Sequence, residues 1–220
     1  MDRREALKLS LLAGAGLVAG AASTLPAHAT QATPATPATP CPGDGTPAQF
    51  LPKTAADPQA HENDIAKYPK CPYCGMDRKQ FHHSRMLVHY ADNLADGTCS
   101  IHCAAISLSL NIDREPKAIW VGDNAAASEV KPLVEVDKAS FLVGSSLKGV
   151  MTKRSKVAYG SAEAASAARA AHGGELANFD QALLAAYTDM SQDVSMIRKN
   201  RAERRKRMME QQGRPAEHKS

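Results

Sequence analysis

Cys71-Pro72-Tyr73-Cys74-Gly75-Met76 and, further along, Cys99-Ser100-Ile101-His102-Cys103 are the most informative stretches of this chain. Together they hold four of its five cysteines as two close pairs. Four thiolates brought together in this way form either a site for a soft metal or a disulfide frame. The rest of the sequence bears on which of these forms, and in which compartment.

Residues 1–29 have the composition of an export signal. Arg3 and Arg4 precede an uncharged run at 9–22, and an A-x-A cleavage site ends at Ala29. The arginine pair resembles a twin-arginine signal, which is read by the pathway that exports folded proteins. The apolar run is too short to span a bilayer comfortably. We therefore expect a periplasmic protein with no transmembrane anchor in its mature form.

Residues 30–61 are rich in Pro, Ala, Thr and Gly, with Ala-Thr-Pro three times in succession at 32–40. Such a segment cannot bury enough apolar surface to fold, so we expect a disordered linker. It contains the odd thiol, Cys41, which we expect either to be idle or to pair with another chain. Residues 62–195 then form one metal-binding domain, long enough to enclose a core.

The hydrophobic pattern of this domain occurs twice. Residues 85–90 alternate as a strand, 100–111 have the pattern of a helix, and 118–121 form a short apolar strand. The second copy has two strands, an alanine-rich helix and a strand, at 139–143, 156–159, 162–172 and 175–179. The helix has Ser161 as its expected N-cap. We predict the α+β class with two duplicated ββαβ-like units, followed by a long C-terminal helix.

The C-terminal helix is expected to open at Asp180, because apolar residues from Leu183 to Ile197 form a stripe that can pack on the domain. Residues 196–220 form a basic extension. Nine Lys/Arg and three Glu give 198–219 a net +6, against +4 for the whole chain, which leaves −2 elsewhere. These cations either form a solvated helix end or dock on an acidic partner or an anionic membrane surface. No nucleic acid is expected, because no aromatic platform accompanies the charge.

The helix at 100–111 has two faces. Cys99 and Cys103 lie one turn apart on one of them, and Ile101 lies on the other, which we expect to pack on the sheet. The nearby helix N-terminus predicts a lowered pKa for Cys99. His102 points sideways from the thiols, so it is a weaker candidate ligand than either cysteine.

The first cysteine pair lies in a turn. Gly75 permits a left-handed backbone, so that both sulfurs can point to one centre. Met76 adds a thioether, which suits Cu(I) better than zinc; the alternative is that Met76 fills a gap in the core. Four thiolates on one ion predict a closed zinc site, whereas two or three sulfurs with a thioether predict an open Cu(I) site. Disulfides remain a third alternative in an oxidising periplasm.

The Cys71-Pro72-Tyr73-Cys74 quartet also matches the active site of glutaredoxins, which predicts a thiol oxidoreductase. There a buried strand leads into the quartet and a long helix leaves it. Residues 64–70 lack the pattern of a buried strand, and 75–78 are a poor helix start. The chain also has no serine nucleophile motif, phosphate loop or catalytic carboxylate pair, so we expect no enzyme.

The order of four segments resembles the NosL family over about residues 68–185: Cys71–Met76, the strand at 118–121, Gly149-Val150-Met151, and 171–180. Residues 99–103 also resemble the second half of TRASH and YHS-type metal-sensing motifs, in which CxxxC follows CxxCG. The NosL resemblance implies a duplicated α+β fold, periplasmic placement and Cu(I) binding. It further implies a copper chaperone that is accessory to the maturation of nitrous oxide reductase.

The resemblance also implies ligands, namely the cysteines and methionine of the first block and Met151. Met151 is followed by Thr152, where a glycine would be expected from the family pattern. The full set of candidate ligands for Cu(I), or alternatively zinc, is Cys71, Cys74, Met76, Cys99, His102, Cys103 and Met151. The expected partner is a copper enzyme client or its assembly machinery.

Overall fold

The structure is a computed structural model that describes residues 52–212. The expected export signal at 1–29, most of the expected linker, Cys41 and residues 213–220 lie outside the described residues. Within the described part, no helix is both long enough and apolar enough to cross a membrane.

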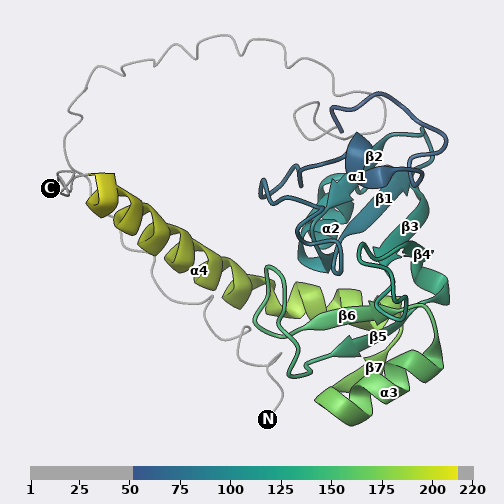
Figure 1. Ribbon diagram of the computed structural model, residues 1–220. Helices are drawn as coiled ribbons and strands as arrows, with labels where there is room; N and C mark the ends of the chain where they lie inside the picture. The colour runs from purple at the N-terminus through teal and green to yellow at the C-terminus, as the bar shows by residue number, and fades with distance from the viewer. Residues whose placement is uncertain (1–51, 213–220) are drawn as a thin grey trace, which may run out of the picture. The chain divides into compact units, whose positions relative to one another are not determined.

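The first half of the fold is a ββαβ unit built around β1 (Met86–Tyr90). β2 (Ala95–Thr98) and β3 (Pro116–Gly122) pair with its two edges, and α2 (Ile101–Leu110) connects them. β4 (Leu133–Glu135) adds a fourth strand beside β3, which gives the order β2-β1-β3-β4 (Figure 1). A one-turn helix, α1 (Asp64–Lys67), precedes this unit, and a 3-10 turn, η2 (Val136–Lys138), follows it.

The second half repeats this arrangement around β5 (Ser140–Val143). β6 (Lys156–Tyr159) and β7 (Glu175–Ala177) pair with it, α3 (Ala162–His172) connects them, and the order is β6-β5-β7. In both units the first strand is central and antiparallel to its neighbours, with Val88 opposite Asp96 and Ile119, and Leu142 opposite Val157 and Leu176. The predicted α+β class with two ββαβ units is therefore confirmed.

One core joins the two units. It contains the alternate residues Met86, Val88 and Tyr90 of β1, together with Phe141 and Val143 of β5. α2 contributes Ile101, Ala104 and Ala105, and the first turns of α4 (Phe179–Gln212) contribute Ala182 and Ala186. α4 is thus the long C-terminal helix expected from the apolar stripe, and it continues through most of the basic extension (Figure 1).

The second strand of the first unit was expected, but its position at β2 was not located, because Asp and Gly are poor strand formers. Tertiary packing explains it. A Cβ at Gly97 would lie 2.5 Å from the Tyr68 Cβ and 2.7 Å from the Arg78 Nη1, so only glycine lets these side chains cover the strand. The strand expected at 175–179 ends early because Asn178 caps α4: its Oδ1 accepts from the Gln181 N at 2.9 Å.

The folded unit begins before residue 62, where the expected linker was to end. Ala60 is fully buried beneath the outer face of the first sheet, and the His61 ring stacks on Trp120 with ring centroids 4.6 Å apart. The Asp57 N also donates to the Asn93 O at 2.8 Å. These contacts supply the burial that the composition of the segment alone does not provide.

Candidate metal centre

Four thiols meet at one point of the fold. The Sγ atoms of Cys71, Cys74, Cys99 and Cys103 all lie within 4.8 Å of one another, and the four cysteines are free thiols rather than disulfides. The Cys74–Cys99 pair is separated by 3.4 Å and the Cys99–Cys103 pair by 3.8 Å. A tetrahedral ion with sulfur bonds of about 2.3 Å holds its sulfurs about 3.8 Å apart. The spacing of the thiols therefore suits a single soft ion.

Local structure explains how the two cysteine pairs converge. The first pair lies in a loop that closes on itself, since the Cys71 N donates to the Met76 O at 2.9 Å and the Gly75 N donates to the Cys71 O at 2.8 Å. Gly75 has a φ of 76°, the left-handed conformation expected for it. The second pair flanks the start of α2, so that Cys99 and Cys103 lie one turn apart as predicted.

Two thioethers pack against these thiols. Met76 comes from the same loop as the first cysteine pair, and Met151 comes from the loop between β5 and β6 in the second unit. Met151 has a φ of 61°, which costs a residue with a Cβ about 1–2 kcal/mol. Met151 itself, and not the residue after it, has this left-handed conformation. Such strain persists only where the surroundings impose it.

The loop that bears Met151 is held by α4. The Lys153 N donates to the Asp193 Oδ1 at 3.1 Å, and Asp189 accepts from the Lys156 Nζ and the Arg154 Nε, both at 2.8 Å. The sequence offered a signal for this anchor, because Asp189 and Asp193 are one turn apart on an expected helix. Their partners lie far away in the chain, so the role itself could not be assigned.

His102 is buried next to the thiols but is not among them. Its Nδ1 lies 3.6 Å from the Asp193 Oδ2, too long for a hydrogen bond, and the thiol group contains no histidine among the described residues. Burial lowers the pKa of His102, although the Asp193 carboxylate opposes the shift. The imidazole lies between α2 and α4, where burial disfavours its charged form.

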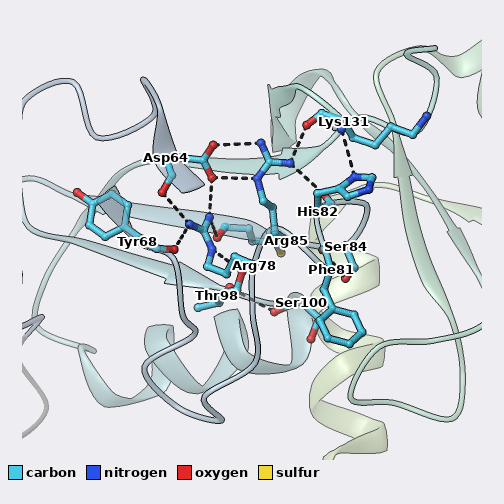
Figure 2. Close-up of polar contacts among 11 residues, drawn as sticks. Asp64, Tyr68, Arg78, Phe81, His82, Ser84, Arg85, Thr98, Ser100 and Lys131 are labelled. Carbon is cyan, nitrogen blue, oxygen red and sulfur yellow. Dashed lines mark hydrogen bonds and ion pairs between the residues drawn. The ribbon is translucent and has the colours of Figure 1, made fainter. Parts of the chain in front are cut away.

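A buried ion network supports both cysteine segments (Figure 2). Arg78 is fully buried and donates to the Asp64 Oδ2 at 2.7 Å, and Arg85 donates to the same carboxylate at 2.9 and 3.0 Å. Arg78 also donates to the Thr98 O at 3.1 Å. Because Arg78 follows Met76 by two residues and Thr98 precedes Cys99, this guanidinium ties the two cysteine segments together.

The same network supplies charge. Two guanidinium groups share one carboxylate, which leaves one excess positive charge. The Arg78 guanidinium is near enough to interact electrostatically with Cys71. A nearby cation favours the thiolate form of cysteine. The network was not predicted, because only the fold brings Asp64 and Arg85 to Arg78.

Hydrogen bonding within the cluster divides the thiols. Bonds from the Cys103, Cys74 and Cys99 thiols lower the pKa of Cys71. The bonds that Cys103 makes with the other three sulfurs raise its own pKa. At Cys99, the bond from Cys103 lowers the pKa, but the Cys71 and Cys74 sulfurs and burial outweigh it. The lowered pKa expected for Cys99 is therefore wrong, because its sulfur neighbours dominate over the helix N-terminus. The sulfur neighbours therefore favour the thiolate form of Cys71.

A second buried chain fixes Tyr73, between the first two cysteines. Its hydroxyl donates to the Asp96 Oδ2 at 2.5 Å, and Ser107 on α2 donates to the same oxygen at 2.7 Å. Burial raises the pKa of both Tyr73 and Asp96. This chain joins the Cys71–Met76 loop to β2 and α2, and Asp96 was not recognised because it lies in the strand whose position was not located.

The surroundings of the first cysteine pair differ from those expected of a thiol oxidoreductase. Residues 71–76 lie in turns, and within the described chain no helix begins at Cys74. The structure therefore lacks the strand and helix that place the reactive cysteine in that class.

Comparison with known proteins gives a family match and a similar solved structure. The NosL family model matches residues 62–186. The crystal structure of the copper chaperone NosL from Shewanella denitrificans is similar with a TM-score of 0.43 and 24% sequence identity, over 50% of this chain and 87% of that chain. No curated protein matches this chain.

Proposed function

The chain belongs to the NosL family, and from this membership and the sulfur cluster we propose that it is a Cu(I)-binding accessory protein. It holds the ion and passes it to a copper enzyme client or to the machinery that assembles one, without catalysing a reaction itself. The observation that carries the proposal is the meeting of four thiols within 4.8 Å, with two thioethers packed against them.

The donor set favours Cu(I). Thiolates and thioethers are soft ligands, and Cu(I) accepts both, whereas zinc gains little from a thioether. Met76 and Met151 reach the cluster from different units, and Met151 does so in a strained conformation. A methionine that only filled a gap would not require this strain, so we assign Met151 to the copper site. We assign Met76 to it because Met76 packs against the thiols from the same loop as Cys71 and Cys74.

The burial of the sulfurs suits an ion that is exchanged. Cys71, Cys99 and Cys103 are almost fully buried, whereas Cys74 is half-buried and lines an open cavity together with Met76 and Met151. The buried thiols hold the ion away from water, and the exposed edge offers a partner access to it. The excess charge of Arg78 and Arg85 offsets the negative charge of a thiolate-bound Cu(I).

Zinc is the second candidate for the same residues. The four thiols have the mutual spacing of a tetrahedral site, and such a site would stabilise the fold without chemistry. The chain would then be a zinc-structured interaction module. The half-buried thioethers at the open edge favour copper over this alternative.

Compartment and client are parts of the proposal. The twin-arginine-like signal at 1–29 supports export to the periplasm as a folded protein. The client implied by the family resemblance is nitrous oxide reductase.

A metal competition separates the two candidates. The purified chain is titrated with Cu(I) against a competing chelator under anaerobic conditions, and zinc is measured in the same sample. We expect Cu(I) to bind far more tightly than free thiols do and to displace any zinc. Retention of stoichiometric zinc, with copper bound no more tightly than by free thiols, would overturn the copper function.

A further inference from the structure

A large cavity opens beside the exposed edge of the sulfur site. Its volume is about 1070 Å³, and its lining includes Cys74, Met76 and Met151 on one side and the basic part of α4 on the other. Met196 on α4 also lines it, opposite the two site methionines. Copper that leaves through the half-buried edge therefore enters this cavity.

Charge in the cavity is strongly one-sided. Six cationic side chains and one carboxylate line it. The carboxylate, Asp77, is already paired with Lys70 at 3.0 Å. Arg201 donates to the Cys74 O at 3.1 Å, which fastens α4 to the cysteine loop.

Four of the cations remain unpaired. Among residues 52–212, the side chains of Lys148, Lys153, Arg204 and Arg207 have neither a hydrogen bond nor an ion pair, and all four are exposed. Lys148 and Lys153 belong to the Met151 loop, and Arg204 and Arg207 lie one turn apart on the facing side of α4. Unpaired cations on both walls of a hollow attract anionic groups that can enter it.

We propose that this cavity docks an acidic segment of the protein that exchanges copper with the chain, with its carboxylates between Arg204 and Arg207 on one wall and Lys148 and Lys153 on the other. The proposal rests on the copper function and adds the chemistry of the partner and the place where it binds. The part of α4 that lines the cavity, from Met196 to Arg207, follows the segment matched by the family model, which ends at residue 186.

The cavity favours a protein segment over a lipid surface. The four unpaired cations surround a hollow next to Cys74, so an anion must enter the hollow to reach both walls. An extended acidic peptide can do so and can bring a sulfur or imidazole ligand close to Met76 and Met151. The flat surface of an anionic bilayer cannot follow the two walls inward.

Fluorescence anisotropy tests the docking on the copper-free chain. The probe is a fluorescein-labelled oligo-glutamate peptide, with an oligo-glutamine peptide of equal length as its control. R204Q/R207Q should weaken peptide binding about 3- to 10-fold, since each exposed ion pair contributes modestly. R198Q/R205Q removes the same charge from residues of α4 that do not line the cavity and should change binding less than about 2-fold. Equal losses in the two variants would show unspecific attraction and overturn the proposal.

Carbodiimide cross-linking of the bound peptide adds a positional test. Mass spectrometry should locate the cross-links on Lys148 and Lys153, and not on the exposed Lys138, which lies outside the cavity. Cross-links spread over all exposed lysines would overturn the proposal. A second outcome would also overturn it: phosphatidylglycerol vesicles bind the chain, this binding depends on Arg204 and Arg207, and the peptide does not bind.

The Cu(I) affinity of R204Q/R207Q separates this proposal from the function on which it rests. The affinity should equal that of the unchanged chain, because neither arginine contacts a sulfur. Copper bound normally by a chain that does not dock the peptide would overturn the docking alone. A chain that docks the peptide without binding Cu(I) would overturn the copper function and support the docking surface.

Discussion

The two ββαβ units share one topology but make different contributions to the site. In the first unit, residues 91–94 join the first two strands, and α2 is buried against both the sheet and α4. In the second unit, residues 144–155 form a longer loop that reaches the sulfur site, and Ala165 is the one residue of α3 that is buried. The scaffold is thus repeated, while the sulfur ligands lie in the loop before β1, at the start of α2, and in the Met151 loop of the second unit.

This difference shows that residues from both ββαβ units surround the sulfur site. The first unit supplies every thiol, and the second supplies one thioether. α4 fixes this arrangement, because its side chains bond to the Met151 loop at Lys153 and to the cysteine loop at the Cys74 O. Changes in the first unit should therefore affect both stability and copper, whereas most changes in the second should affect one of them.

The largest effect is expected from Arg78→Met. The change removes the hydrogen bonds that join the two cysteine segments and leaves several buried carbonyls without a donor. Asp64 keeps Arg85 as its partner, so the cost comes from the buried carbonyls, and at about 1–3 kcal/mol each they should lower the free energy of unfolding by about 3–5 kcal/mol. Urea unfolding measures it, with Arg169→Met on the exposed surface of α3 as the control, expected within about 0.5 kcal/mol of the unchanged chain. Similar values for the two variants would show that the network does not support the first unit.

Cys71→Ser should weaken Cu(I) binding more than about 100-fold. The neighbouring sulfurs lower the pKa of Cys71 and so favour its thiolate form. Losing a thiolate ligand should exceed the loss of about 10- to 100-fold that is typical of residues that only support ligands. Chelator competition gives the affinity, and Cys41→Ser provides the same exchange outside the domain. The thiol assignment fails if both variants bind copper alike.

Met151→Leu should reduce Cu(I) affinity about 10-fold and leave zinc affinity unchanged. The loss is smaller than that of a thiolate because a neutral thioether carries no charge to attract the ion. Leucine keeps the volume of the side chain but has no thioether. Met208→Leu, at a half-exposed position near the end of α4, is the matched control. Equal losses of copper and zinc, or no loss of either, would remove Met151 from the ligand set.

The smallest effect is expected from Ser161→Ala in the second unit. The Ser161 Oγ accepts from the Ala164 N at 3.2 Å as the N-cap of α3. Its loss should lower the free energy of unfolding by about 1 kcal/mol without changing copper affinity. Ser166→Ala, on the exposed side of the same helix, should change neither quantity. A clear fall in copper affinity for Ser161→Ala would contradict the separation of scaffold from site.

The sequence allowed the elements with strong periodicity to be predicted. The pattern at 85–90 and 139–143 located both central strands, and the two cysteine pairs located the thiols. The position of β2 was not predicted, because Gly97 is a poor strand former. Its role is to leave room for the Arg78 side chain, and this contact exists only in the folded chain.

The residues that support the site could also not be predicted from the sequence. Asp64 forms ion pairs with both Arg78 and Arg85 in the first unit. Asp193 of α4 accepts a hydrogen bond from the Met151 loop of the second unit. Their spacing in the chain has no motif, because the fold rather than local structure brings them together. The left-handed conformation of Met151 could not be predicted for the same reason.

Selenium-edge X-ray absorption of the selenomethionine-labelled chain tests most directly whether the two units share one copper ion. On loading with Cu(I), we expect a selenium–copper scattering contribution. Its amplitude should be lower in each of the single variants Met76→Leu and Met151→Leu, and unchanged in Met208→Leu. Copper bound with no selenium–copper scattering would place the ion on the thiols of the first unit alone and contradict a site shared between the two copies.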